Sequence, residues 1–99
     1  MILSFADQET EDIYHGKNSK KARQRLATTL WSKAQVKLDM LKKAKSLEDL
    51  KAPPNNRLEK LSRDLAGKHS IRINDQWRII FKWEEARLAV SDVKITDYH

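Results

Sequence analysis

Apolar residues in the first half of the chain recur with the spacing of a helix. Between Lys20 and Lys45 there is no glycine or proline, and an apolar side chain returns every three or four residues. This pattern predicts one amphipathic helix, or two helices with a break near Trp31 and Ser32. The apolar stripe consists of Leu26, Leu30, Ala34, Leu38 and Leu41. The opposite, polar face carries Arg23, Arg25, Lys33, Lys37 and Lys43.

Short elements are expected before this helical region. Residues 2–5 are apolar and β-compatible, which predicts a first strand. Asp7 is suited to cap a brief helix over residues 10–14, which Gly16 would end. Ser19 can cap the longer helical region that follows.

Two prolines separate the helical half of the chain from a β-rich half. Residues 46–50 predict a short capped turn of helix, and Pro53 and Pro54 prevent its continuation. Beyond them the apolar period changes to two, which predicts strands over residues 69–73, 77–83 and 88–95, with a weaker signal at 57–61. The alternation of the last strand slips near Ser91 and Asp92, where we expect a β-bulge.

The length of one turn decides which side chains share a face of the sheet. A loop of Asn74, Asp75 and Gln76 pairs Arg72 with Arg78. One face then carries Ile71, Ile73, Trp77, Ile79, Phe81 and Trp83, and the other carries Arg72, Arg78, Ile80 and Lys82. A two-residue loop mixes the apolar and basic residues on both faces, so the longer loop is favoured.

These elements predict an α+β fold in a single domain formed by residues 1–99. An N-terminal strand and two to three helices are expected to pack on one face of a small, mainly antiparallel sheet. The arginine-bearing face of the sheet is then left uncovered.

The charge of the chain favours a negatively charged partner. It carries 20 Lys and Arg against 14 Asp and Glu, a formal net charge of +6. Such a bias attracts nucleic acid, a ribosome, an acidic protein or an anionic membrane surface, and charge alone does not choose among them.

Several kinds of site and location are not expected. Cysteine is absent and the histidines at positions 15, 69 and 99 lack metal-ligand spacing, so we expect no metal or other cofactor. No apolar run has the length of a membrane helix, and the acidic residue at position 7 comes too early for a signal peptide. We therefore expect a cytoplasmic protein without a membrane partner.

Arg72 and Arg78 are the first candidates for chemistry. Two like charges opposite each other on neighbouring strands repel, so an anion is expected between them. Arginine suits phosphate because its planar fork binds two oxygens at once. The alternative is that each arginine pairs with its own carboxylate, for instance Asp92 or Asp97.

The C-terminal Asp97-Tyr98-His99 is the second candidate group. Histidine changes charge near neutral pH and can therefore carry a proton. Residues 57–60 lie just after the prolines and offer either a lysine or a glutamate to the arginine face. His69 is more typical of a solvated strand residue than of a catalyst.

Several stretches of this sequence, most clearly between Pro53 and His99, resemble a known family. The run Ser70-Ile71-Arg72-Ile73-Asn74-Asp75-Gln76-Trp77-Arg78-Ile79-Ile80-Phe81, followed by a hairpin and a terminal Asp97-Tyr98-His99, closely resembles HigB toxins of the RelE/ParE superfamily. Asn55-Asn56-Arg57-Leu58-Glu59 and Gly67-Lys68-His69-Ser70 are similar to the middle region of that family.

The resemblance implies a RelE-like fold and a type II toxin that cuts messenger RNA in the A site of the 70S ribosome. It implies a HigA-like helix-turn-helix antitoxin as partner, through which the complex binds operator DNA. The residues implied in catalysis are Arg72, Arg78, His99, Asp97, Tyr98 and Lys60. Arg57, Lys68 and Lys82 are the further basic residues expected to bind substrate.

Two other functions remain open at this point. A ParE-like toxin of the same fold inhibits DNA gyrase and cleaves nothing, and such chains generally lack a terminal Asp-Tyr-His. A non-catalytic basic module would bind ribosomal RNA or a protein, and loss of His99 would be harmless to it.

Overall fold

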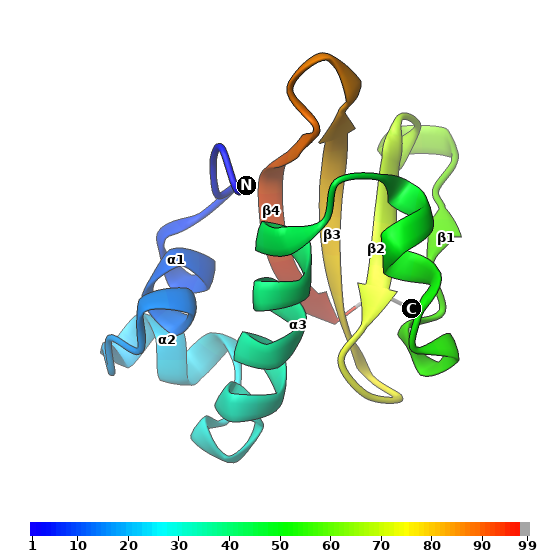
Figure 1. Ribbon diagram of the computed structural model, residues 1–99. Helices are drawn as coiled ribbons and strands as arrows, with labels where there is room; N and C mark the ends of the chain where they lie inside the picture. Colours follow the sequence, from blue (N-terminus) through cyan, green and yellow to red (C-terminus); the bar gives the residue numbers. More distant parts are fainter. Residues whose placement is uncertain (98–99) are drawn as a thin grey trace.

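A four-stranded antiparallel sheet with strand order β1-β2-β3-β4 is the frame of the protein. The computed structural model describes residues 1–97. The strands are β1 (Glu59–Lys60), β2 (Lys68–Arg72), β3 (Trp77–Glu84) and β4 (Ala89–Asp97), and the helices are α1 (Gln8–His15), α2 (Lys20–Arg25) and α3 (Trp31–Lys43). Figure 1 shows the three helices gathered on one side of the sheet, with α3 lying against it. The expected α+β class is confirmed.

The β2–β3 hairpin has the predicted register. Ile71 pairs with Ile79 and Arg72 with Arg78. The side chain of Asn74 closes the loop, since its Oδ1 accepts hydrogen bonds from the backbone N–H groups of Gln76 (2.9 Å) and Trp77 (2.7 Å). The loop length inferred from the apolar pattern is therefore correct.

The main core lies between the helices and the predicted apolar face of the sheet. From the sheet and the β2–β3 loop it contains Ile71, Ile73, Ile79, Phe81, Val90, Val93 and Ile95, and from the helical half chiefly Ile13, Leu26, Trp31, Ala34, Leu38 and Leu41. Trp77 and Trp83 are only partly buried at its edge. No helix within residues 1–97 combines the length and the apolar character needed to span a bilayer.

The bulge in β4 also explains a departure from the predicted N-terminal strand. The β3–β4 pairing shifts between Ile80 and Lys82, and Asp92 adopts a left-handed backbone with φ 51°. Residues 2–5 run beside this bulge and form two isolated parallel bridges, Ile2 with Val90 and Phe5 with Val93. Because the bulge lies between the two bridges, a continuous strand does not form there.

The helical half begins at the predicted caps but is interrupted earlier than predicted. Asp7 caps α1, Gly16 ends it in a left-handed conformation, and Ser19 caps α2. The break falls at residues 26–30 rather than near Trp31, which is the first residue of α3. The Trp31 indole N–H donates to the Leu26 carbonyl at 2.8 Å, so the extended backbone at Leu26 keeps a buried partner.

Lys37, which the sequence places on the polar face of the helical region, is not exposed to solvent. Its side chain is buried, and its ammonium donates to the Asn56 side-chain oxygen. Asn56 is itself fully buried in the 3₁₀ turn Pro54–Asn56, which packs near α3. The turn after the two prolines therefore covers Lys37 on the polar face of the helical region.

Arg25 ties three elements together. Its guanidinium contacts the Asp7 carboxylate at 2.7 Å and the Glu9 carboxylate at 3.0 Å, and it donates to the Ile95 carbonyl at 2.7 Å. Burial acts to raise the pKa of the Asp7 carboxyl, but hydrogen bonds from Thr10 and Arg25 outweigh it and lower that pKa overall. Arg25 thus links α2 to the start of α1 and to β4.

We expect Arg25→Gln to lower the free energy of unfolding by about 2 kcal/mol, because it removes partly buried charged hydrogen bonds. Arg23→Gln, whose bonds to Asn18 are exposed, is the control and should cost less than about 0.5 kcal/mol. The Asp7 carboxylate contributes to the stability of the folded protein at pH values above its pKa in the unfolded chain. This contribution is lost as the pH falls through its pKa in the folded protein, which is lowered. The Arg25→Gln effect in urea unfolding should therefore shrink below about pH 4. Equal losses for the two variants would refute this role.

Candidate functional site

Arg78 lies on the sheet face that points away from the helices, and contacts from the β1 region hold it in place. Its Nη1 is 3.3 Å from the Glu59 carboxylate, and its Nη2 donates to the Arg57 carbonyl at 2.9 Å. The Arg78 side chain is only 13% exposed. Its guanidinium is therefore positioned before any ligand arrives.

Two polar atoms near this position are buried without a partner. The Nε of Arg78 and the Oγ of Ser70 make no hydrogen bond within the part of the chain that the structure describes. Ser70 pairs with Ile80, which is two residues after Arg78 on β3. Side chains two residues apart on a strand lie on the same face, so Ser70 and Arg78 share one face of the sheet. A buried unpaired polar atom costs free energy, so such atoms indicate a site that an incoming group completes.

The register of β1 selects Glu59 rather than Lys60 for this face. Glu59 pairs with Ser70, whereas Lys60 pairs with His69, whose partner Phe81 belongs to the helix-side core. The structure therefore places Lys60, a predicted site residue, with the opposite set of side chains. Residues 57–60 had offered either a lysine or a glutamate, and the pairing brings the glutamate to Arg78.

His69 lies beside Lys60 in a partly buried position. Its ring stacks on Phe81 with centroids 6.1 Å apart, and its Nδ1 is buried without a partner among residues 1–97. Burial, and then the positive charge of Lys60, lower the pKa of His69 below its ordinary value. The neutral form of this histidine is therefore favoured in the folded protein.

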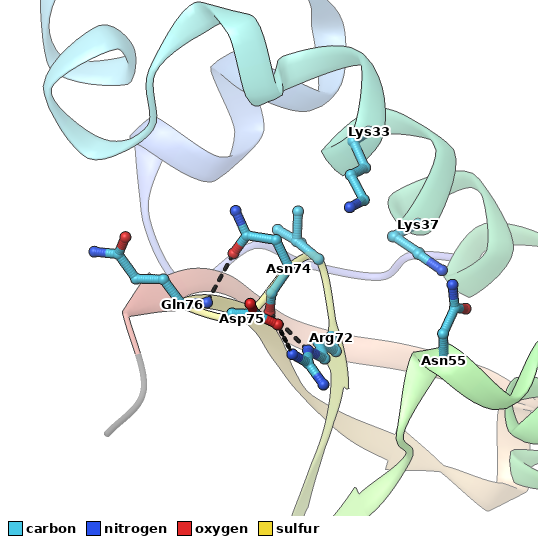
Figure 2. A pocket seen from close by; sticks show the side chains of 8 residues that line it. Lys33, Lys37, Asn55, Arg72, Asn74, Asp75 and Gln76 are labelled. Atoms are coloured by element: carbon cyan, nitrogen blue, oxygen red, sulfur yellow. Dashed lines mark hydrogen bonds and ion pairs between the residues drawn. The ribbon is translucent and has the colours of Figure 1, made fainter.

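Arg72 pairs with Arg78 across the strands, but its side chain turns toward the β2–β3 loop. Its Nε donates to the Asn74 carbonyl at 2.9 Å and its Nη2 contacts the Asp75 carboxylate, as Figure 2 shows. Each arginine thus has an acidic partner, as the alternative interpretation held. Arg72 pairs with Asp75 and Arg78 pairs with Glu59. These carboxylates take the place of Asp92 and Asp97, which the sequence offered as examples.

The other predicted basic residues are spread along the strands, since Lys68 pairs with Lys82 four positions from the Arg72–Arg78 pair and Arg57 lies just before β1. Lys82 lies 3.8 Å from Glu84, Lys68 is partly buried, and the Arg57 side chain is exposed. A hollow of about 310 Å³ on the sheet is lined by Ile80 and Leu65 and by the charged residues Lys68, Lys94 and Asp92.

Asp97 is the one member of the C-terminal group that the structure places. It ends β4 opposite Trp77, and its carboxylate accepts a hydrogen bond from the Gln76 side chain at 2.9 Å. Tyr98 and His99 lie outside the described residues. Within residues 1–97 no group of three or more potential metal ligands comes together.

Sequence reasoning missed Ser70, Lys33, Lys37 and Asn55 as possible site residues. Ser70 had a usable signal, because it alternates with Arg72 on a strand whose register was predicted correctly. The other three line a pocket with Arg72, and their proximity depends on how the turn after the prolines packs against α3.

We expect Ser70→Ala to leave the free energy of unfolding unchanged or to raise it, because it removes a buried hydroxyl that has no hydrogen-bond partner among residues 1–97. Thr10→Val is the matched control, since Thr10 is equally buried but its hydroxyl accepts a hydrogen bond from the Ile95 N–H at 3.0 Å. That variant should lose about 1–3 kcal/mol. Urea unfolding of both variants measures this, and a comparable loss for Ser70→Ala would contradict the idea that its hydroxyl is unpaired.

Known proteins are similar to this chain in sequence or in fold. Residues 3–99 match the family model described as the RelE-like toxin of the type II toxin-antitoxin system HigB. Toxin HigB-1 of Vibrio cholerae serotype O1 is 36% identical over 83 residues, which cover 84% of each chain. An uncharacterized protein of Haemophilus influenzae is 37% identical over 60 residues, or 61% of this chain and 59% of that protein.

A solved structure is similar in fold alone. It is the YoeB-YefM complex from Staphylococcus aureus, with a TM-score of 0.60, 18% identity and coverage of 100% of this chain and 95% of that one. The family match spans nearly the whole chain, and the identity to the Vibrio cholerae toxin extends over most of it. The chain therefore belongs to the HigB-like toxins, the RelE-like toxins of type II toxin-antitoxin systems.

Proposed function

We propose that this toxin is a ribosome-dependent endoribonuclease that cuts messenger RNA in the ribosomal A site. The observation that carries the proposal is the group formed by Arg78, Ser70 and Glu59 on one sheet face. A positioned guanidinium with an unpaired Nε suits a phosphate, and a carboxylate next to it suits proton transfer.

The proposed reaction is an attack of a ribose 2′-oxygen on the adjacent phosphorus. The 2′-OH gives its proton to a base as the new P–O bond forms, and the bond to the 5′-oxygen breaks. That leaving oxygen receives a proton from an acid, so the products are a 2′,3′-cyclic phosphate and a free 5′-OH. Arg78 holds this phosphate and neutralises the charge that develops on it, and Arg72, its strand partner, binds the RNA strand beside it.

Two groups are proposed for the proton transfers. Glu59 contacts Arg78 and is half exposed, so its carboxylate is placed to accept the 2′-OH proton. His99 is proposed as the other proton carrier, with Asp97 orienting its imidazole and Tyr98 stacking on a base. In this scheme Lys60 acts outside the reacting group, through its charge near His69.

Basic side chains around the reacting group are proposed to bind the RNA strand and the ribosome. Arg57 lies just before β1, Lys68 begins β2 and pairs with Lys82 of β3, and the chain as a whole carries a formal charge of +6. Binding should weaken as salt rises, because each phosphate contact releases counterions. This work would be done in the cytoplasm, where translating ribosomes are found.

The proposed partner of the toxin is an antitoxin of the HigA type. The family belongs to type II toxin-antitoxin systems, and the similar solved structure is itself the YoeB-YefM complex. We propose that this antitoxin carries a helix-turn-helix and binds operator DNA together with the toxin.

Mapping of transcript 5′ ends after induction tests the proposal in cells. The wild-type chain should arrest growth and create new ends inside translated codons. Arg78→Gln and His99→Gln should lose both, and an activity reduced about 10²- to 10³-fold is expected for loss of a group that stabilises transition-state charge. Arg87→Gln is the charge-matched control, because Arg87 is exposed in the turn between β3 and β4.

Other outcomes would assign a different function. Growth arrest without new ends would contradict cleavage and favour the gyrase-inhibitor or non-catalytic readings. Full activity of Arg78→Gln would remove Arg78 from the site. Absence of arrest by the wild-type chain would contradict action as a toxin under these conditions.

A further inference from the structure

A pocket of about 550 Å³ lies between α3 and the β2–β3 loop, at the end of the sheet near Arg78. Figure 2 shows Lys33 and Lys37 extending from α3, Asn55 from the turn after the prolines, and Arg72 and Asn74 from the hairpin. Three of its lining side chains are basic and one, that of Asp75, is acidic. The excess of positive charge and the amide groups suit a phosphate ester.

Lys37 is the buried charge of this pocket. The residue is 6% exposed, and within the described chain its ammonium has one side-chain partner, the Asn56 oxygen. An ammonium carries three N–H donors, so its capacity for hydrogen bonds is not filled. Burial, and then the nearby charge of Lys33, lower the pKa of Lys37. An anion in the pocket would offset both unfavourable effects.

The acidic residue of the pocket is easily displaced. The Asp75 side chain is 98% exposed, whereas the Arg72 side chain with which it pairs is 25% exposed. An ion pair whose carboxylate lies fully in water contributes little to stability. A phosphate can therefore take the place of Asp75 on the planar fork of Arg72.

Arg72 connects this pocket to the proposed reacting group. It is the strand partner of Arg78, so the two residues lie side by side at the end of the β2–β3 hairpin. A nucleic acid strand with one phosphate at Arg78 meets Arg72 next and then the lysines of α3. This continuity favours an RNA strand over an unrelated acidic peptide as the occupant.

We propose that the Lys33–Lys37–Arg72 pocket is a second phosphate site, which binds a backbone phosphate of single-stranded RNA adjacent to the one held at Arg78. The proposal rests on the proposed function for the identity of the strand. The phosphate site itself acts in binding and contributes no group to the proton transfers. Its loss should therefore change RNA affinity and its salt dependence.

Fluorescence anisotropy with a short, labelled 2′-O-methyl oligoribonucleotide tests this on the purified full chain. That probe lacks the 2′-OH nucleophile, so it stays intact whether or not the chain is a nuclease. Lys33→Gln should weaken binding and reduce the slope of log affinity against log salt by about 0.7, the value for one phosphate contact on a single strand. Lys42→Gln is the control, because Lys42 is exposed at the other end of the same helix. Its slope should equal that of the wild type.

A variant that should bind RNA more tightly tests whether a phosphate displaces Asp75 from Arg72. Asp75→Asn should tighten RNA binding about two- to fivefold, because Arg72 no longer has to release a carboxylate. Glu48→Gln removes the same charge from another exposed ion pair, with Lys51, and should have no comparable effect. Lys37 is left unchanged in these tests because substitution of a buried side chain also alters stability.

Equal slopes for Lys33→Gln and Lys42→Gln would overturn the proposal. A short oligoglutamate peptide that binds the wild type and is weakened by Lys33→Gln, while RNA binding is not, would identify a protein-docking surface and also overturn it. Failure of the proposed function alone has a different signature: no transcript is cleaved in cells, but the salt slope of RNA binding still falls in Lys33→Gln.

Discussion

The pairing of β2 with β3 is the constraint on which the rest of the site depends. Asn74 closes the turn by accepting two backbone hydrogen bonds, and the register that follows places Arg72 opposite Arg78. A shift by one residue would move Arg78 into the core and Ile79 to the opposite face. Apolar burial on the helix side therefore stabilises the position of the polar side chains on the other side.

The two faces of the sheet differ in how completely their side chains are satisfied. On the helix side, Ile71, Ile79 and Phe81 are fully buried in the core. On the other side, Ser70 and Arg78 bury polar atoms that have no hydrogen-bond partner among residues 1–97, and the Arg78 guanidinium is held by Glu59 and the Arg57 carbonyl. Unpaired groups lower stability but leave donors ready for a ligand. In this toxin the free energy gained in the core can offset that cost.

The parts of the structure that were predictable depend on local signals, and the rest depend on packing between distant segments. The caps at Asp7 and Ser19 and the hairpin register are set by neighbouring residues, so the sequence patterns identified them. Lys37 was misplaced because its burial requires Asn56 from a turn 19 residues away. The choice between Glu59 and Lys60 depends on the β1–β2 register, and the irregular segment between those strands has no pattern that encodes it.

The most direct test of this account is the side-chain NMR signal of Arg78 in the protein with selectively ¹⁵N-labelled arginine. An oligoribonucleotide with a single 2′-deoxy substitution at the cleavage position is added, either bound in the A site of the ribosome or alone at low salt. The Nε–H of Arg78 should then change its chemical shift more than that of Arg87. The Arg78 N–H should also exchange more slowly with water, because a phosphate oxygen has become its partner. An Arg78 signal that stays unchanged while the oligonucleotide binds would contradict the central claim that this guanidinium receives the phosphate.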